Sequence, residues 1–466
     1  MSPGVQVLAV GAAAPAWRVA ASDVGGAWGR GGKGQAAVCA PDEDTLTLAA
    51  EAAGRALAAS GLQTDIVDGL WWGTTRPPFA EGPSHAVLAR AIGLSHRSAG
   101  ALCAGSPHAG MEALLGAADA IGSGSARVAL VVASDALVPG TGTGFEARTG
   151  AGAAAIVLVS HGGTASLGER VTRTHPFLDR YRGDREDATR DLYDPRLFRE
   201  EIFVPTLHEL GEQLDGDGIR AWSLPDPDGR LGATVAKQLG VALVASAPVY
   251  AELGDTGAAA ALLGGIGALD EQGTVAFVGY GGGRATALEV TVKDPVAGAA
   301  RVASTIAGGR SVSYPEVLRA RGQLVASGEK VAMGVPPESA QFVRGADEML
   351  GLLGARCVDC GTINTPPSIH PHCTSCGSAK FVLEPLARRG SIHTFVVNQT
   401  MPAPFVAPLP LAVIDLEDGA RVMLQCIGDG SDLAIDTDVD LVLRRYAYER
   451  GVPVYGYKAR SAETVT

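Results

Sequence analysis

Residues 102–137 read LCAGSPHAGMEALLGAADAIGSGSARVALVVASDAL, and this stretch decides the fold. Apolar residues recur at helical spacing over 106–121, and the β-branched run at 129–137 is typical of a strand. Strands that alternate with helices of this length predict right-handed βαβ crossovers and a parallel sheet covered on both faces. Cys103 lies where the helical pattern begins, so we expect the positive end of the helix dipole to favour its thiolate.

The same alternation of strands and helices runs through residues 1–300. A second helix is predicted over 44–59, and a polar, charged stretch at 173–200 interrupts the pattern as an insertion between two halves. We therefore expect two α/β halves, residues 1–165 and 166–335, although no repeat between them is detectable by identity. The predicted strands lie in the runs VQVLAV, DGLWWGT, RVALVVAS, GAAAIVLVS, VAFVGY and TALEVTV.

After residue 300 the pattern changes. Residues 312–324 have the spacing of an amphipathic helix, and a helical segment followed by a cysteine-rich stretch is expected over 336–384. From residue 385 to 466, short alternating strands are separated by tight turns. Strands of this kind predict a small β-barrel.

The composition suits a tightly packed globular protein, with 46% apolar and 19% charged residues. A length of 466 residues allows two or three domains, because single cores stop growing near about 250–300 residues. The 38 basic and 50 acidic residues give a net charge of −12, which argues against a nucleic-acid or anionic-membrane surface. No run approaches the roughly 20 apolar residues of a membrane span, and the N-terminus lacks the basic region of a signal peptide. Three of the seven cysteines, Cys39, Cys103 and Cys426, are scattered along the chain, which fits a protein of the reducing cytoplasm.

Two Cys-x2-Cys motifs separated by twelve residues give the strongest local signal in the chain. Such knuckles bring four thiolates to a tetrahedron, which is the arrangement that zinc prefers. Because four protein ligands leave no open position, we expect a structural and not a catalytic zinc site. His370 and His372 lie in the loop and could substitute, but the preferred ligands are Cys357, Cys360, Cys373 and Cys376.

The stretch around Cys103 resembles the nucleophile helix and following strand of the thiolase superfamily. It is most similar to the branch that holds β-ketoacyl-ACP synthase III and 3-hydroxy-3-methylglutaryl-CoA synthase. The resemblance implies a layered αβαβα fold built from two similar halves. Further segments resemble that branch in the same order, namely TGAGAAAIVLV (149–159), LPDPDGRLGATVAKQLGV (224–241), AELGDTGAAAALLGGI (251–266) and GYGGGRATALEV (279–290).

The C-terminal part resembles the acyl-CoA-associated OB-fold family, whose members accompany thiolase-like enzymes, usually as separate subunits. The cysteine-rich stretch and LPLAVIDLEDGARV (409–422) carry this resemblance, and SVSYPEVLRARGQL (311–324) is similar to the end of archaeal-type hydroxymethylglutaryl-CoA synthases. The chain is therefore expected to be a fusion, in which the thiolase-like halves are followed by a zinc ribbon and a small OB-fold barrel.

By this resemblance Cys103 is the acyl-accepting nucleophile, but three positions that run condensation in the family carry other residues. Pro225 stands in place of the general-base histidine, Asp255 in place of an asparagine, and Thr75 in place of the general-acid glutamate. General acid–base help is worth about 10²–10⁴ in rate, so a standard decarboxylative condensation would be crippled. Loading an acyl group on the cysteine needs only a thiolate, backbone N–H donors and a thioester leaving group.

Several other residues are candidates for the site. Asp255, Asp226 and Asp228 could act as bases for an acyl acceptor, although the DPDG sequence also suits a plain turn. Tyr250 and Tyr280 could donate a proton, although a tyrosine in such a position is more often a packed core residue. His108 fits either the pocket or a helix-surface or core position. The expected substrate-binding residues are Thr75, His108, Tyr280, Gly281 and Gly282.

Together these features predict an acyltransferase or carbon–carbon bond-forming condensing enzyme that works through an acyl-Cys103 intermediate. Two alternatives stay open, a thiolase-fold retro-aldolase that uses tyrosines and a non-catalytic scaffold partner of an active homologue. The resemblance implies a CoA or phosphopantetheine thioester as substrate, an acyl-CoA or acyl-carrier protein as partner, and a homodimer or larger homo-oligomer. The Ala-, Gly- and Arg-rich usage suits a role in specialised metabolism.

Overall fold

The chain divides into two compact units, the first made of residues 1–89 and 94–325 and the second of residues 90–93 and 326–466. The predicted boundary between residues 335 and 336 lies outside the described residues, and the boundary between 165 and 166 stays a prediction. The computed structural model describes residues 4–190, 194–214, 218–244, 248–325, 345–401, 407–449 and 452–462.

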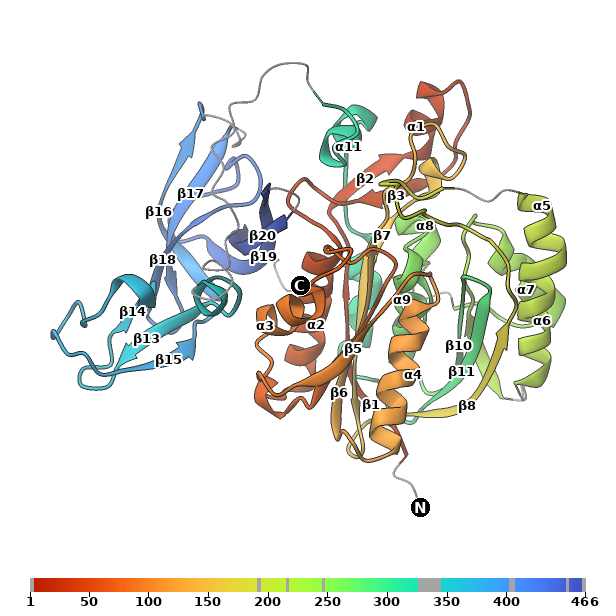
Figure 1. The fold of residues 1–466 in the computed structure, drawn as a ribbon, viewed down its shortest axis with the longest axis horizontal. Coiled ribbons are helices and arrows are strands. Elements are labelled where there is room, and N and C mark those ends of the chain that lie inside the picture. Colours follow the sequence, from red (N-terminus) through yellow and green to blue (C-terminus); the bar gives the residue numbers. More distant parts are fainter. Residues whose placement is uncertain are drawn as a thin grey trace. The chain divides into compact units, whose positions relative to one another are not determined.

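Among the described residues, nine strands form one mixed sheet in the first unit (Figure 1), in the order β5 (Ala99–Ala104), β4 (Gly69–Thr74), β6 (Val128–Ala136), β7 (Ala151–Val159), β1 (Gln6–Ala13), β8 (Ala165–Thr174), β11 (Arg284–Val292), β10 (Gly273–Gly281) and β9 (Ile219–Ser223). The pairs β4–β5, β4–β6 and β9–β10 are parallel. The pairs β6–β7, β1–β7, β8–β11 and β10–β11 are antiparallel, so the prediction of a parallel sheet is wrong for much of it. The physical reason is clearest at β10 and β11, because Gly282 and Gly283 join them in a tight hairpin that imposes antiparallel pairing.

The two helices predicted at 44–59 and 106–121 are confirmed as α2 (Thr45–Ser60) and α4 (Ala109–Gly122), which pack on the sheet. The Asp44 side chain accepts hydrogen bonds from the first turn of α2, and the helix ends at Gly61 in a left-handed conformation. The remaining α-helices of the described residues are α1 (Ala21–Ala27), α3 (Ser84–Ala91), α5 (Pro195–Leu197), α6 (Val204–Gln213), α7 (Leu231–Leu239), α8 (Val249–Leu253), α9 (Ala260–Ile266), α10 (Val302–Ala307) and α11 (Tyr314–Ala320).

The main core of the first unit lies between α4, α9 and the strands that they cover. It is built from small and branched apolar side chains, and Leu114, Ile121 and Leu263 are fully buried in it. A small separate sheet has the order β12 (Arg310–Ser311), β2 (Trp17–Ala20) and β3 (Gln35–Val38). No helix in the described part of the chain is both long and apolar enough to cross a membrane.

In the second unit, the described residues form a five-stranded sheet in the order β18 (Arg421–Gln425), β17 (Leu409–Leu416), β16 (Arg389–Asn398), β19 (Asp438–Glu449) and β20 (Val452–Ser461). A bridge between Cys426, directly after β18, and Ala459 on β20 nearly closes this sheet into a barrel. The predicted small barrel is therefore confirmed. A second sheet of this unit has the order β14 (Ile363–Asn364), β13 (Leu353–Cys357) and β15 (Phe381–Pro385), and it carries the cysteine motifs.

Candidate active site

Cys103 is the penultimate residue of the edge strand β5, where it pairs with Gly73 of β4 and is half-buried. The helix α4 begins later than predicted, at Ala109. Burial raises the pKa of the Cys103 thiol, and the negative charge of Glu112 in the first turn of α4 raises it further. The prediction that the helix terminus favours the thiolate is therefore wrong, because burial dominates and the first turn of the helix, which begins six residues after Cys103, carries an acidic residue.

The glycine turn between β10 and β11 lies against the segment that follows Cys103. A Cβ atom on Gly281 would lie 2.6 Å from the backbone nitrogen of His108. Gly282 has φ +59°, and a Cβ atom there would lie 2.8 Å from the Cβ atom of Ser106. These two positions therefore accept no side chain without displacing their neighbours. The structure thus brings the predicted residues Gly281 and Gly282 to the nucleophile segment.

His108 is fully buried between α4 and β11. Its Nε2 atom lies 2.9 Å from Oγ1 of Thr286, and its Nδ1 atom lies 3.4 Å from Oε1 of Glu112. Glu112 in turn forms an ion pair with Arg284. Because both ring nitrogens of His108 already face protein partners, a contact with substrate would have to displace one of them.

Thr75 is held by a buried carboxylate that the sequence analysis did not identify. The backbone N–H and the hydroxyl of Thr75 each donate to Oδ1 of Asp135 at 2.9 Å, and the hydroxyl of Thr74 does the same at 2.9 Å. Oδ2 of Asp135 accepts from the backbone N–H of Ala258 at 2.7 Å. Burial raises the pKa of this carboxyl. The available signal was a lone acidic residue at the end of an otherwise apolar strand.

Asp255 is buried next to that network, with both carboxylate oxygens engaged. Oδ1 accepts from the backbone N–H of Gly257 at 2.9 Å, and Oδ2 forms an ion pair with Arg180. The guanidinium of Arg180 lies 4.8 Å from the ring centroid of Phe145. Arg180 comes from the polar stretch that was predicted as an insertion, so this stretch contributes directly to the site.

Asp226 and Asp228 lie in the turn before α7 and have different surroundings. Oδ1 of Asp228 accepts from the backbone N–H groups of Arg230 and Leu231, both at 2.9 Å, and so stabilises the turn that leads into α7. Burial raises the pKa of Asp226, and its Oδ1 atom has no hydrogen-bond partner among the described residues. Burial raises the pKa of Tyr250, and the charges of Asp255, Asp226 and Asp228 raise it further.

Tyr280 packs in a second core cluster. Its ring centroid lies 5.7 Å from that of Phe198 and 5.1 Å from that of Phe203, both in edge-on geometry. Burial raises the pKa of its phenol, and the Oη atom has no hydrogen-bond partner within the described chain. These contacts give Tyr280 a packing role, and its predicted contact with substrate stays a prediction.

The four motif cysteines of the second unit do converge. The sulfurs of Cys357, Cys360, Cys373 and Cys376 all lie within 4.8 Å of one another. Asn364 also approaches this cluster, because its Nδ2 atom lies 3.8 Å from the sulfur of Cys373. Four thiolates at this separation match the donor set of a structural zinc site. His370 and His372 are not part of the cluster among the described residues.

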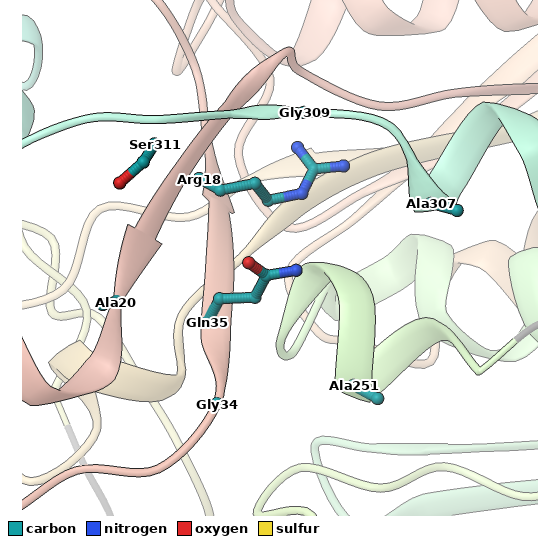
Figure 2. Close-up of a pocket in the computed structure, with 8 residues that line it drawn as sticks. All are labelled: Arg18, Ala20, Gly34, Gln35, Ala251, Ala307, Gly309 and Ser311. Carbon is teal, nitrogen blue, oxygen red and sulfur yellow. The ribbon is translucent and has the colours of Figure 1, made fainter.

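The first unit also has a cavity of about 590 Å³ (Figure 2). None of the candidate site residues lines it. Arg18 is its charged residue, with Gln35 beside it. The guanidinium of Arg18 donates to the carbonyl oxygens of Ile306 at 2.9 Å and Gly308 at 2.6 Å, where α10 ends. Arg18 therefore has a structural role, because it satisfies the last carbonyls of that helix.

Comparison with known proteins supports both parts of the expected fusion. Residues 383–444 match the family described as "ChsH2, C-terminal OB-fold domain". Hydroxymethylglutaryl-CoA synthase of Thermococcus onnurineus is 33% identical over 156 residues, which is 33% of this chain and 45% of the relative. The synthase of Methanococcus maripaludis strain C6 is 28% identical over 162 residues, which is 33% of this chain and 46% of the relative. The chain thus spans less than half the length of these curated relatives.

Solved structures show the fold of the first unit. MvaS in complex with 3-hydroxy-3-methylglutaryl coenzyme A aligns with a TM-score of 0.60 at 20% identity, over 72% of this chain and 96% of that one. The 3-oxoacyl-(acyl carrier protein) synthase III of Pseudomonas aeruginosa PAO1 aligns with a TM-score of 0.55 at 21% identity, over 63% of this chain and 99% of that one. The predicted thiolase-like fold followed by an OB-fold domain is confirmed.

Proposed function

We propose that this chain is an acyltransferase or carbon–carbon bond-forming condensing enzyme that accepts an acyl group from a CoA or carrier-protein thioester on Cys103. The observation that carries this proposal is the close packing of the glycine turn at Gly281 and Gly282 against the segment that follows Cys103. Similarity to hydroxymethylglutaryl-CoA synthases and to a synthase III structure supports a thioester substrate.

The reaction would proceed in two steps. The Cys103 sulfur attacks the thioester carbonyl, the carbon–sulfur bond to the carrier breaks, and the departing thiolate takes up the proton of the cysteine. An acceptor then attacks the acyl-cysteine, the new acyl bond forms, and the bond to Cys103 breaks. The proton of the acceptor passes to a carboxylate and from there to the released cysteine thiolate.

Among the three candidate carboxylates, the contacts favour Asp226 as the base for the acceptor. Asp255 is committed to Arg180 and Gly257, and Asp228 holds the turn before α7. Asp226 keeps one oxygen without a partner among the described residues, and burial raises its pKa, which makes its carboxylate a stronger base. This reaction needs no decarboxylation, in keeping with the replacement of the family histidine by Pro225.

The cysteine cluster would hold a structural zinc ion through Cys357, Cys360, Cys373 and Cys376. When bound, zinc supplies a cross-link between the two knuckles and neutralises part of the thiolate charge. With four protein ligands the ion has no open position for substrate, so we assign it no step in the reaction.

We also propose a homodimer or larger homo-oligomer that acts in the cytoplasm, in specialised metabolism, on an acyl-CoA or an acyl-carrier protein. The edge strand β5 supports self-association, because Ala99, Gly100 and Ala101 are exposed at the end of the sheet. Exposed edges of this kind pair readily with another strand. Light scattering on the purified chain measures this, and a monomeric mass across micromolar concentrations contradicts it.

Intact-mass measurement after incubation with a panel of acyl-CoAs tests the function. The wild-type chain is expected to gain the mass of one acyl group, and Cys103→Ala is expected to lose that gain. Cys426→Ala is the matched control, since Cys426 is a free, buried thiol in the other unit. Absence of the adduct together with cleavage of a β-hydroxy thioester would support the retro-aldolase alternative.

The replacement of three family residues by Pro225, Asp255 and Thr75 is the observation that favours the non-catalytic scaffold, and the raised pKa of Cys103 agrees with it. Inactivity toward every thioester, with or without Cys103, would support that alternative.

A further inference from the structure

Residues 175–180 connect β8 to the rest of the polar stretch and contact two separate loops of the candidate site. The backbone N–H of His175 donates to the carbonyl of Gly283 at 2.7 Å. Oδ2 of Asp179 accepts from the backbone N–H of Gly282 at 2.9 Å. The next residue, Arg180, forms the ion pair with Asp255. Two adjacent side chains therefore hold two different loops, one on each side of α9 and β10 in the sequence.

We propose that Asp179 and Arg180, which we name the 179–180 clip, are positioning residues for the acylation of Cys103. Asp179 would fix the glycine turn against the nucleophile segment, and Arg180 would fix the loop that carries Asp255. The proposal rests on the proposed function, and it assigns a role in that reaction to the polar stretch.

The case for Asp179 depends on the tight packing at Gly282. Asp179 is 6% exposed, so its carboxyl group is largely removed from water, and it holds the exposed turn residue Gly282 through a part-buried hydrogen bond. Gly282 also has no free space toward Ser106, three residues after Cys103. A shift of the turn caused by loss of this hydrogen bond would therefore be passed directly to the nucleophile segment.

The case for Arg180 depends on the cost of leaving a buried charge unpaired. The side chains of Arg180 and Asp255 are only 12% and 6% exposed. Removing one partner of such a pair leaves an uncompensated charge, which is strongly unfavourable. Asp255 is joined through Gly257 to the loop whose Ala258 binds Asp135, so a displaced Asp255 would disturb the support of Thr75 as well.

The hydrogen bond between Gly282 and Asp179 is also compatible with an inhibitory role for Asp179. If a substrate oxygen needs the Gly282 N–H as its donor, the Asp179 carboxylate competes for it, and removal of that carboxylate would accelerate acylation. Two observations favour the clip: Asp179 is buried, and the next residue, Arg180, also holds a loop through its ion pair. A slower acylation after removal of the Asp179 carboxylate supports the clip, and a faster acylation supports the inhibitory role.

The test measures the rate constant of Cys103 acylation by intact mass in single turnover, as a function of acyl-CoA concentration. Asp179→Ala is expected to lower the maximal rate constant at least about 10-fold and to leave the half-saturating concentration within about twofold, because the loss is one of orientation. Asp179→Asn keeps an oxygen acceptor and is expected to stay within about threefold of wild type. Asp184→Ala is the matched control, since Asp184 is an exposed acid of the same stretch.

A compensating pair of variants tests the second side chain. Arg180→Gln is expected to slow acylation about 10-fold, and Arg180→Gln combined with Asp255→Asn is expected to recover most of the rate, because both charges are then absent. If the wild type gains no acyl group, the proposed function fails and the clip fails with it. If the wild type is acylated but Asp179→Ala reacts as fast or faster, or if the double variant stays as slow as Arg180→Gln, the function stands and the clip is wrong.

Discussion

Cysteines occur in two contrasting settings in this molecule. The four thiols of the second unit lie within 4.8 Å of one another and come from two short motifs. Cys103 stands alone on an edge strand, and burial and Glu112 raise the pKa of its thiol. The cluster is built by local turns, whereas the surroundings of Cys103 come from distant loops. Spacing along the chain therefore describes the first setting well and the second poorly.

The largest expected effect is the loss of bound zinc, which should follow from a change in the cysteine cluster but not from a change at Cys103. Cys373→Ser is expected to abolish binding of one zinc ion per chain and to unfold the ribbon, because structural zinc contributes about 10 kcal/mol or more to such folds. Cys103→Ser is expected to leave the zinc content unchanged. Elemental analysis and limited proteolysis measure both, and equal zinc content in Cys373→Ser would remove the distinction.

The next effect concerns Asp135, the buried carboxyl group that holds Thr74 and Thr75 at the end of the strand beside Cys103. Asp135→Ala is expected to lower the free energy of unfolding of the first unit by about 3 kcal/mol, since it leaves two buried and two part-buried donors without their acceptor. Chemical denaturation measures this, with Asp187→Ala on the exposed polar stretch as control. A loss below about 1 kcal/mol would show that water replaces the carboxylate.

The same carboxyl predicts a dependence of stability on pH. Burial raises the folded-state pKa of Asp135 above its unfolded value, so the folded state binds the proton more tightly. The unfolding free energy of the wild type should therefore fall as the pH rises from about 4 through the raised pKa. Asp135→Asn is expected to remove this contribution, and identical pH profiles for the two proteins would contradict it.

A smaller effect on stability is expected for Asp228. This residue is a candidate base, but its hydrogen bonds are those of the turn before α7. Asp228→Ala is expected to cost about 1 kcal/mol of stability, because the first turn of α7 loses an acceptor. Asp228→Asn is expected to retain that stability. Thermal unfolding compares the two, and equal losses in both would argue for a role of the charge itself.

The smallest effect concerns the thiol itself. Glu112→Gln removes a negative charge that raises the pKa of Cys103, so it is expected to increase the rate of alkylation by iodoacetamide at pH 8 about threefold. Mass mapping of the modified cysteine gives the rate, and Glu81→Gln, an exposed acid elsewhere in the unit, is the control. An unchanged rate would show that burial alone holds the proton on the sulfur.

Much of the fold could be predicted from the sequence because its signals are local. The periodicity at 44–59 and 106–121 specifies two helices, and the thiolase-like and OB-fold resemblances are borne out. Strand direction was not predictable in this way. The antiparallel pairing of β10 with β11 follows from a short turn, which the alternation of strands and helices does not reveal.

The candidate site shows the same division. The sequence analysis named Gly281 and Gly282 as candidate site residues, and the structure places both against the segment that follows Cys103. The partners of Thr75 and Asp255 were not, because Asp135 and Arg180 are 60 and 75 residues away in the chain. The state of the Cys103 thiol was mispredicted for a related reason, since it depends on the burial and the acidic neighbour that the folded chain supplies.

The crowded glycine turn has a consequence for attempts to redesign this protein. Any library that introduces larger residues at Gly281 or Gly282 would push on the backbone after Cys103 and return mostly damaged variants. A change in substrate selectivity would have to come from residues outside this turn, where side chains of different size can be accommodated. The same restriction applies to natural variation at these two positions.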